Sequence, residues 1–222
     1  MYETLLMDKI GAIYCINLRK RTDRLKNFID NFPPNYISKL KVVGAVDASN
    51  HVLSDEEKAK LKNADWNVNT GRGQWGCSFS HESVWRNIVA NNIQYAIVLE
   101  DDAVFNRSED FAEFLKMFNL LDLKHCYLGP ANHPENTIMT PHDFTNLACP
   151  TICKMMSNLG SMSYIISLSG ATELLEIIDD KGHYRAVDQL MNDYLKRRNQ
   201  WFCMSPPCFS VAELGSDINK LH

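Results

Sequence analysis

The chain has 222 residues, 45% of them hydrophobic, which is enough for one large domain with a sizeable core and argues against bulk disorder. Its formal net charge of −4, with no long basic run, argues against nucleic acid or an anionic membrane as the main partner. Without a signal-peptide pattern or a run of about 18 apolar residues, the sequence predicts a cytoplasmic protein with no transmembrane segment. The seven scattered cysteines include no CxxC pair, so we expect reduced, mostly buried thiols.

The first predicted strand, residues 10–16, runs into a basic turn. Asn17, Arg21 and Arg24 lie in or near that turn, and Thr22 is the predicted N-cap of a helix that ends at Pro33. Guanidinium groups beside helix N-terminal amides suit a diphosphate. A solvated basic turn is the alternative.

A second predicted strand, residues 40–46, is followed by Asp47. This carboxylate is a candidate for binding a ribose hydroxyl, although acids are common in turns after strands. Ser54 and Glu57 then form a predicted capping box for a polar helix through residue 62.

A longer helix is predicted from the glycine-rich segment at residues 71–81, and its glycines would let the backbone approach a ligand. His81, Val84, Trp85 and Ile88 fall on one face of that helix. His81 is either a site residue or a core-edge histidine bonded to backbone.

The most informative stretch is the apolar run 96–99, which leads directly into Glu100, Asp101 and Asp102. The run predicts a strand buried on both faces, and ligand sites of open α/β sheets lie at the carboxyl ends of such strands. Three adjacent carboxylates repel one another, and Mg²⁺ or Mn²⁺ would relieve that repulsion. A solvated acidic loop is the alternative.

The second half of the chain predicts further strands and helices. Strands are expected at 125–128 and 160–167, helices from Ser108, Ser169 and Ala186, an irregular segment at 131–156 and an extended segment at 201–211. Asp188 lies in the first turn of the last helix, where it either stabilises the helix dipole or has a functional role.

Several blocks of the sequence, taken in order, resemble glycosyltransferase family 25. They are Ile16-Asn-Leu with Arg21 and Arg24, residues 73–81, residues 99–102, residues 160–164, Val187-Asp188 and residues 216–218. The family includes lipooligosaccharide and procollagen galactosyltransferases. The resemblance covers nearly the whole chain except residues 131–156.

The resemblance implies an α/β fold of the GT-A type: a single nucleotide-binding domain over residues 1–222, with a central mixed, mostly parallel sheet flanked by helices. It implies an inverting transfer of galactose or glucose from a UDP-sugar to a hydroxyl of a glycan or glycoprotein, dependent on Mn²⁺ or Mg²⁺. By this likeness Asp102 and Glu100 hold the metal and Asp188 is the catalytic base. The implied donor-binding residues are Asn17, Arg21, Arg24, Asp47, Gln74, Ser80, His81, Glu100 and Asp101.

Two alternatives remain at this point. A glycoside hydrolase also uses paired carboxylates, but it needs no diphosphate site and so leaves the arginine-bearing turn unexplained. A catalytically inactive nucleotide- or glycan-binding protein is the second alternative. The intact acids Glu100, Asp101, Asp102 and Asp188 argue against it.

Overall fold

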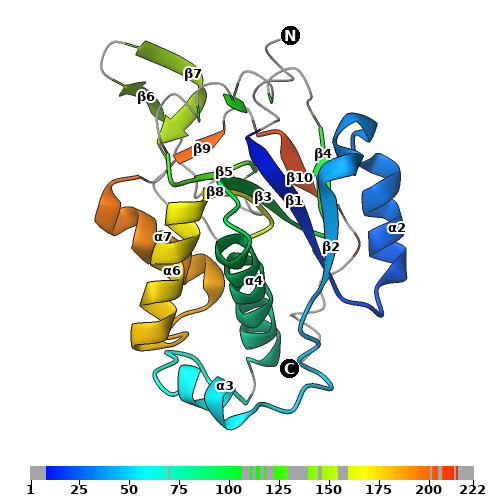
Figure 1. The fold of residues 1–222 in the computed structure, drawn as a ribbon, viewed down its shortest axis with the longest axis vertical. Coiled ribbons are helices and arrows are strands. Elements are labelled where there is room, and N and C mark those ends of the chain that lie inside the picture. The colour runs from blue at the N-terminus through cyan, green and yellow to red at the C-terminus, as the bar shows by residue number, and fades with distance from the viewer. Residues whose placement is uncertain are drawn as a thin grey trace.

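The structure is a computed structural model. It describes residues 9–69, 71–106, 111, 114–115, 118, 123–129, 140–144, 147–154, 160–200, 202–204, 207–212 and 214. Within these residues a mixed sheet has the strand order β2-β1-β3-β8-β5-β9-β7-β6 (Figure 1). Its strands are β1 Ile10–Asn17, β2 Leu40–Gly44, β3 Tyr95–Glu100, β5 His125–Tyr127, β6 Thr140–Phe144, β7 Leu147–Lys154, β8 Ser163–Ser167 and β9 Phe202–Met204. β4, Ala103–Phe105, pairs with β10, Phe209–Val211, in a separate ribbon.

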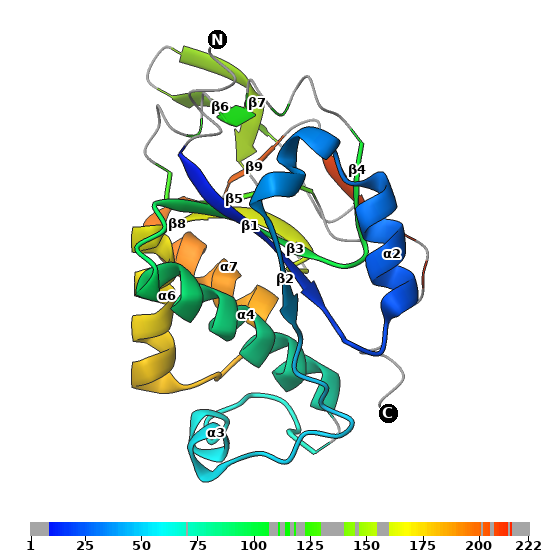
Figure 2. The same ribbon diagram turned by 45° about the vertical axis from the view of Figure 1, so that its right-hand side comes forward.

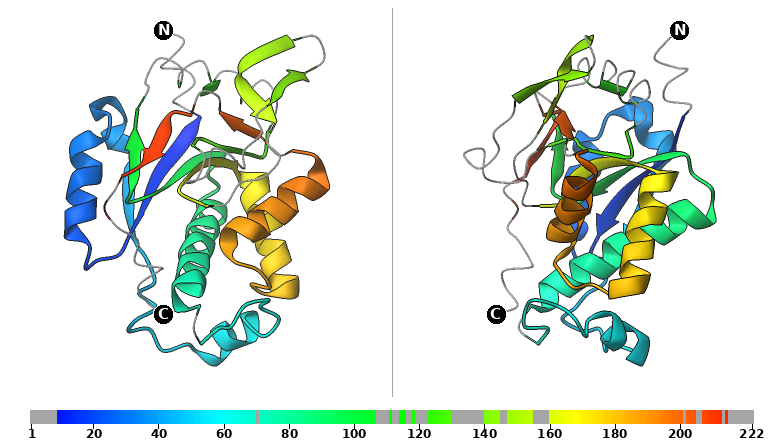
Figure 3. Two further views of the ribbon diagram at one scale, coloured as in Figure 1. Left: turned by 180° about the vertical axis from the view of Figure 1, so that it is seen from behind. Right: turned by 90° about the vertical axis from the view of Figure 1, so that its left-hand side faces the viewer.

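The helices cover both faces of this sheet, which confirms the predicted α/β fold. They are α2 Thr22–Asn31, α3 Asp55–Lys60, α4 Arg72–Ala90, α6 Leu168–Lys181 and α7 Val187–Arg198, with a 3-10 turn at Pro34–Lys39. In Figure 2 α4, α6 and α7 lie on one side of the sheet and α2 lies on the other. The two views of Figure 3 show the same layers from behind and from the side.

Side chains of β1 point alternately to the two faces of the sheet, and each set enters a different hydrophobic core. Ala12, Tyr14 and Ile16 belong to the core beneath α4, α6 and α7. Ile13 and Cys15 belong to the opposite core, which α2 and four helical residues complete: Phe111, Phe114, Leu115 and Phe118. Both sides of the strand are therefore buried, as the unbroken apolar run predicts.

Strand direction brings three chain segments to one edge of the sheet. β1 is parallel to both β2 and β3, with Asn17 opposite Gly44 and Ile16 opposite Glu100. The next neighbour, β8, runs antiparallel to β3. The carboxyl ends of β1, β2 and β3 consequently meet, and the residues that follow them form one wall.

Some predicted element boundaries are wrong. Arg21 occupies the N-cap of α2 and makes no side-chain cap hydrogen bond, so Thr22 is already inside the helix. The helix expected from Ser169 begins at Leu168, because Ser167 accepts the N–H of Gly170. The second strand ends at Gly44 rather than at residue 46.

The prediction of an irregular segment at 131–156 is also wrong for its described part, where β6 and β7 form an antiparallel pair. β7 gains its other partner, β9, from the end of the chain, so local periodicity could not reveal it. The expected extended segment 201–211 is divided between β9 and β10, which lie in different sheets. Ser108 and the block at 216–218 lie outside the described residues.

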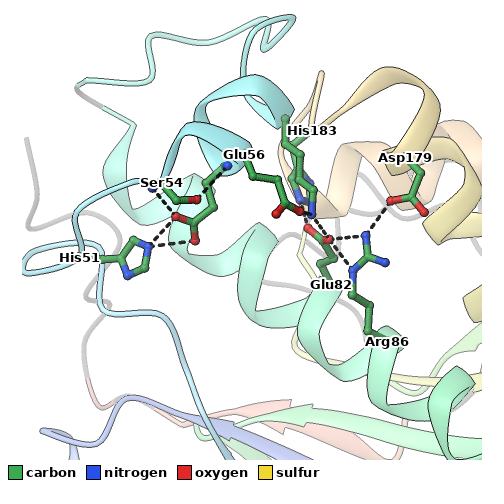
Figure 4. A network of polar contacts seen from close by, with 9 residues as sticks. His51, Ser54, Glu56, Glu82, Arg86, Asp179 and His183 are labelled. Atoms are coloured by element: carbon green, nitrogen blue, oxygen red, sulfur yellow. Dashed lines mark hydrogen bonds and ion pairs between the residues drawn. The ribbon is translucent and has the colours of Figure 1, made fainter.

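A network of polar contacts holds the segment that contains α3 against helix α4 (Figure 4). Glu82 on α4 accepts hydrogen bonds from Lys60 at 2.7 Å and from Arg86 at 2.8 Å, and its other oxygen lies 2.7 Å from His183. Gly182 has φ +71° and packs against the carbonyl oxygen of Lys60, where a Cβ would clash. The predicted capping box at the start of α3 is confirmed.

Among the described helices, none has the length and apolar character that a membrane span requires.

Candidate active site

A cavity of about 260 Å³ opens at the edge where β1, β2 and β3 end. Its walls are the segment between β1 and α2, residues 45–48 after β2, the first turns of α4 and the acids at the end of β3. This is the edge at which open α/β sheets bind ligands. The lining includes Arg24, Asp47, Ser80, His81 and all three adjacent acids, so most of the predicted site residues come together.

Asp101 is buried and held by two neighbours. Asn17 donates to its Oδ2 at 2.6 Å, and Arg24 contacts its Oδ1 at 2.7 Å. Burial raises the pKa of Asp101, and the Arg24 charge and the Asn17 hydrogen bond only partly oppose that rise. Asp101 therefore supports the turn that presents its two neighbours.

Asp102 lies beside the same guanidinium, since Arg24 also pairs with its Oδ2. Burial, followed by the nearby charge of Glu100, raises the pKa of Asp102 to about 7 even though Arg24 lowers it. The positive charge of Arg24 therefore does not fully balance the negative charge of the three acids at the end of β3. The sequence did not anticipate that Arg24 would be buried between two of them.

Glu100 is fixed through one of its oxygens. Ser161 donates to Oε1 at 2.7 Å, and the His81 Nε2 lies 3.4 Å from the same atom. Burial pushes the pKa of Glu100 upward, but the His81 and Ser161 contacts outweigh it and hold the pKa below its ordinary value.

His81 is not bonded to backbone but to other side chains across the core. The Trp85 indole N–H donates to the Tyr164 hydroxyl at 2.9 Å, and that hydroxyl lies 2.8 Å from the His81 Nδ1. Tyr164 is fully buried, and the direction of its hydrogen bond with Nδ1 depends on the tautomer of His81.

The remaining predicted donor residues have other roles in the described structure. Arg21 pairs with Asp23 at 3.0 Å and donates to the Leu214 carbonyl oxygen, outside the cavity lining. Gln74 is exposed in the first turn of α4 and does not line the cavity.

Two predicted residues organise the wall formed by residues 45–48. The Ser80 hydroxyl accepts the Val46 N–H at 2.9 Å, which fixes this segment against α4. Asp47 pairs with Lys20 at 2.8 Å and accepts the Ser49 N–H and hydroxyl, so its carboxylate also stabilises a turn.

Asp188 lies at the start of α7, where its carboxylate accepts the backbone N–H groups of Gln189 and Gly160. Burial raises its pKa against these hydrogen bonds, and the charge of Glu100 adds to the rise. The predicted place in the first helical turn is confirmed. Asp188 is not among the residues that line the cavity, although the charge of Glu100 acts on its carboxylate.

The sequence reasoning missed Ser161, Tyr164 and Cys77 as site residues. Ser161 and Tyr164 meet Glu100 and His81 only through the pairing of β3 with β8. Cys77 lines the cavity one helical turn before His81, within the same glycine-rich segment. Its spacing from His81 is the one signal that could have identified it.

The three residues at the end of β3 supply carboxylate oxygens, the ligand type that a hard divalent cation prefers. Among the described residues that line the cavity, four carboxylates face two cationic side chains, Lys20 and Arg24. Burial is the main cause of the raised pKa of Asp102, and the neighbouring charges of Glu100 and Asp101 add to it. Oxygen donors in such a setting suit Mg²⁺ or Mn²⁺.

The family model "Glycosyltransferase family 25 (LPS biosynthesis protein)" matches residues 10–191. This chain belongs to glycosyltransferase family 25. It is 26% identical to Homo sapiens procollagen galactosyltransferase 2 over 76% of this chain and 28% of that protein. It is also 26% identical to the Haemophilus influenzae lipooligosaccharide biosynthesis protein lex-1, over 67% of this chain and 52% of that protein.

A third family 25 relative bears on activity. A Bos taurus protein named "Probable inactive glycosyltransferase 25 family member 3" is 26% identical over 73% of this chain and 28% of its own length. The chain therefore spans under a third of the procollagen galactosyltransferase and this relative, and about half of lex-1.

Proposed function

We propose that this family 25 chain transfers a hexose, galactose or glucose, from a UDP-sugar to a hydroxyl of a glycan or glycoprotein. The observation that carries the proposal is the cavity at the joined ends of β1, β2 and β3, where Glu100, Asp101 and Asp102 form one wall. A GT-A-type nucleotide-sugar site would occupy this edge of the sheet. The names of the relatives, procollagen galactosyltransferase and lipooligosaccharide biosynthesis protein, support this substrate class.

The charge of the cavity supports a requirement for a divalent cation, Mn²⁺ or Mg²⁺. A nucleotide diphosphate is an anion, and the cavity wall already carries more carboxylates than cationic groups. Asp102 and Glu100 would hold the cation, which would stabilise negative charge on the diphosphate leaving group as a Lewis acid.

The chain's own residues would divide the remaining work. Ser161 and His81 hold Oε1 of Glu100 and so orient the carboxylate. Arg24 fixes Asp101 and Asp102 and places positive charge in the cavity wall, near the diphosphate. Ser80 keeps residues 45–48 against α4, where they would border the nucleoside.

Asp188 is the proposed base for an inverting transfer. The acceptor hydroxyl must lose its proton as it attacks the anomeric carbon, and a carboxylate with a raised pKa is a better proton acceptor than an ordinary one. Burial raises the pKa of Asp188, and its rise also reflects the charge of Glu100. The carboxylate is half-buried at the start of α7, so it is not sealed from an acceptor.

The alternative is an inactive protein that binds a nucleotide or glycan, because the Bos taurus relative is named as probably inactive. Calorimetry with UDP-galactose and UDP-glucose, with Mn²⁺ and then with EDTA, tests the donor site. Product analysis with labelled donor tests transfer and hydrolysis. We expect the nucleotide sugar to bind the parent only with the cation present, and this binding to be lost in Asp102→Asn. Asp55→Asn is the control and should bind like the parent, because the Asp55 side chain is 99% exposed on α3. Binding without turnover in the presence of acceptors would favour the inactive alternative, and no binding of any nucleotide sugar would reject the proposal.

A further inference from the structure

Cys77, His81 and Glu100 converge on one point of the cavity wall. A ligand atom from each lies within 4.8 Å of the other two. Cys77 and Glu100 are partly exposed to the cavity, while His81 is fully buried behind them. A cation that enters the cavity can therefore reach all three groups.

The donor types differ from those of the acid cluster. Sulfur and imidazole ligands favour Zn²⁺ and similar borderline ions, whereas Mg²⁺ and Mn²⁺ favour oxygen. We propose that Cys77, His81 and Glu100 form a second, thiophilic cation site that takes Zn²⁺, with Ser161 or water available as a fourth ligand. Ser161 lies 3.7 Å from the Cys77 sulfur and 2.7 Å from Glu100.

The groups behind His81 suit it to this role. A metal-binding histidine usually has its second ring nitrogen held by a hydrogen bond that fixes the ring. Here the Tyr164 hydroxyl lies 2.8 Å from Nδ1 and has an oxygen that can accept a proton from it. In the tautomer whose Nδ1–H donates to that oxygen, the Nε2 lone pair is available to bind Zn²⁺.

Binding also requires the Cys77 thiolate. Burial raises the pKa of the Cys77 thiol and the charge of Glu100 raises it further, so the free thiol keeps its proton. Zn²⁺ would displace that proton to solvent as the zinc–sulfur bond forms, and Glu100 would bind as a carboxylate.

Glu100 belongs to both sites, and this overlap has a consequence that rests on the proposed function. Zn²⁺ at the thiophilic site would engage the carboxylate that the Mn²⁺ or Mg²⁺ site also uses. Zn²⁺ would then lower the affinity for a nucleotide sugar without occupying the Asp102 position. The existence of the thiophilic site does not depend on transferase activity.

Cobalt titration of the full chain tests the site directly. Co²⁺ replaces Zn²⁺ in such sites and gives a near-ultraviolet thiolate-to-cobalt absorption only when sulfur binds it. We expect this absorption in the parent and in Cys15→Ala, whose thiol is buried on the neighbouring strand β1, and its loss in Cys77→Ala. Glu100→Gln should keep the absorption with at least tenfold weaker affinity. A parent without this absorption, or a Cys77→Ala variant that retains it, overturns the proposal.

Thermal shifts separate the two cation sites. Zn²⁺ should raise the melting temperature of the parent and of Asp102→Asn but not of Cys77→Ala, whereas Mg²⁺ should raise that of the parent and of Cys77→Ala but not of Asp102→Asn. If Cys77→Ala does not fold, alkylation of the parent replaces it: Zn²⁺ and not Mg²⁺ should protect Cys77. Equal protection by both ions, or by neither, overturns the proposal. Absence of transferase activity together with a normal cobalt spectrum would reject only the proposed function.

Discussion

The guanidinium of Arg24 contacts the carboxylate of Asp101 at 2.7 Å, and both side chains are only 7% exposed. Arg24 also pairs with Asp102, so one cation from α2 stabilises two of the acids that end β3. Removal of one partner from a buried ion pair leaves an uncompensated charge, which is far more costly than the loss of a surface pair. The guanidinium therefore stabilises the fold as well as the charge of the cavity.

We predict that Arg24→Gln lowers the free energy of unfolding by about 3–5 kcal/mol, the range found when a buried pair loses one member. Urea denaturation at neutral pH measures this loss. Arg72→Gln provides a matched control, because Arg72 is exposed on α4 and its loss should change stability by no more than about 0.5 kcal/mol. Equal stability of the two variants would show that Arg24 contributes no more to stability than an exposed surface cation.

Asp102→Asn tests the hard-cation site. The substitution removes one carboxylate charge and one anionic oxygen from the acid cluster, so Mn²⁺ and Mg²⁺ should bind more weakly and donor binding should lose its cation dependence. Folding should be retained or improved, because burial already disfavours the ionised form of Asp102. Calorimetry of Mn²⁺ binding, with a melting curve on the same sample, measures both effects. A variant that binds Mn²⁺ as tightly as the parent contradicts the assignment.

The sequence predicted the site edge because the relevant signals are local. An apolar run followed by acids predicts a buried strand with a polar carboxyl end, and parallel strands bring such ends together. Glu100, Asp101 and Asp102 indeed line one cavity with Arg24, and Asn17 donates to Asp101. The family resemblance, drawn from the same residues, was confirmed by the matched family model.

The partners within the site could not be predicted because they are distant in sequence. His81 meets Tyr164 across 83 residues, and Ser161 meets Glu100 across 61. Those contacts depend on β8 lying antiparallel beside β3, which no local pattern specifies. The basic turn was likewise ambiguous, since its arginines could face a diphosphate, solvent or, as Arg24 does, the buried acids.

Glu82 gives a prediction about acid stability. Burial raises its pKa, but hydrogen bonds and charges from His183, Lys60 and Arg86 outweigh burial and lower the pKa from 4.5 to about 2. A carboxylate with a lowered pKa in the folded state stabilises the fold above its unfolded pKa, and that stability is lost as pH falls towards the folded pKa. The network in Figure 4 should therefore weaken between pH 4.5 and about 2.

We predict that the parent loses about 3 kcal/mol more stability than Glu82→Gln over this pH interval, at 1.36 kcal/mol per unit of pKa shift. Denaturant unfolding of both proteins at a series of pH values measures the difference. The comparison cancels the remaining carboxylates, which are common to both proteins. Parallel stability curves would show that Glu82 keeps an ordinary pKa.

The last prediction tests whether Asp188 is the catalytic base or only stabilises the first turn of α7. Its carboxylate accepts the Gln189 N–H at 2.8 Å, a bond that an asparagine side-chain oxygen can also accept. Asp188→Asn should therefore melt near the parent temperature and bind the nucleotide sugar with similar affinity. Asparagine cannot accept the acceptor's proton, so the transfer rate should fall by about 10² to 10⁴, the usual contribution of a general base.

The control for Asp188→Asn is Asp193→Asn, because Asp193 lies later on the same helix, where its carboxylate pairs with Arg185. Its rate should match that of the parent, which excludes a general effect of charge on this helix. Steady-state kinetics with saturating donor and acceptor measures the transfer step, and a lower kcat with unchanged donor affinity places the defect in the transition state. If Asp188→Asn keeps a rate within about threefold of the parent, well below the general-base range, Asp188 only stabilises the first turn of α7, and another carboxylate must accept the proton. Asp47 is then the first to test, because its carboxylate lies in the lining of the cavity.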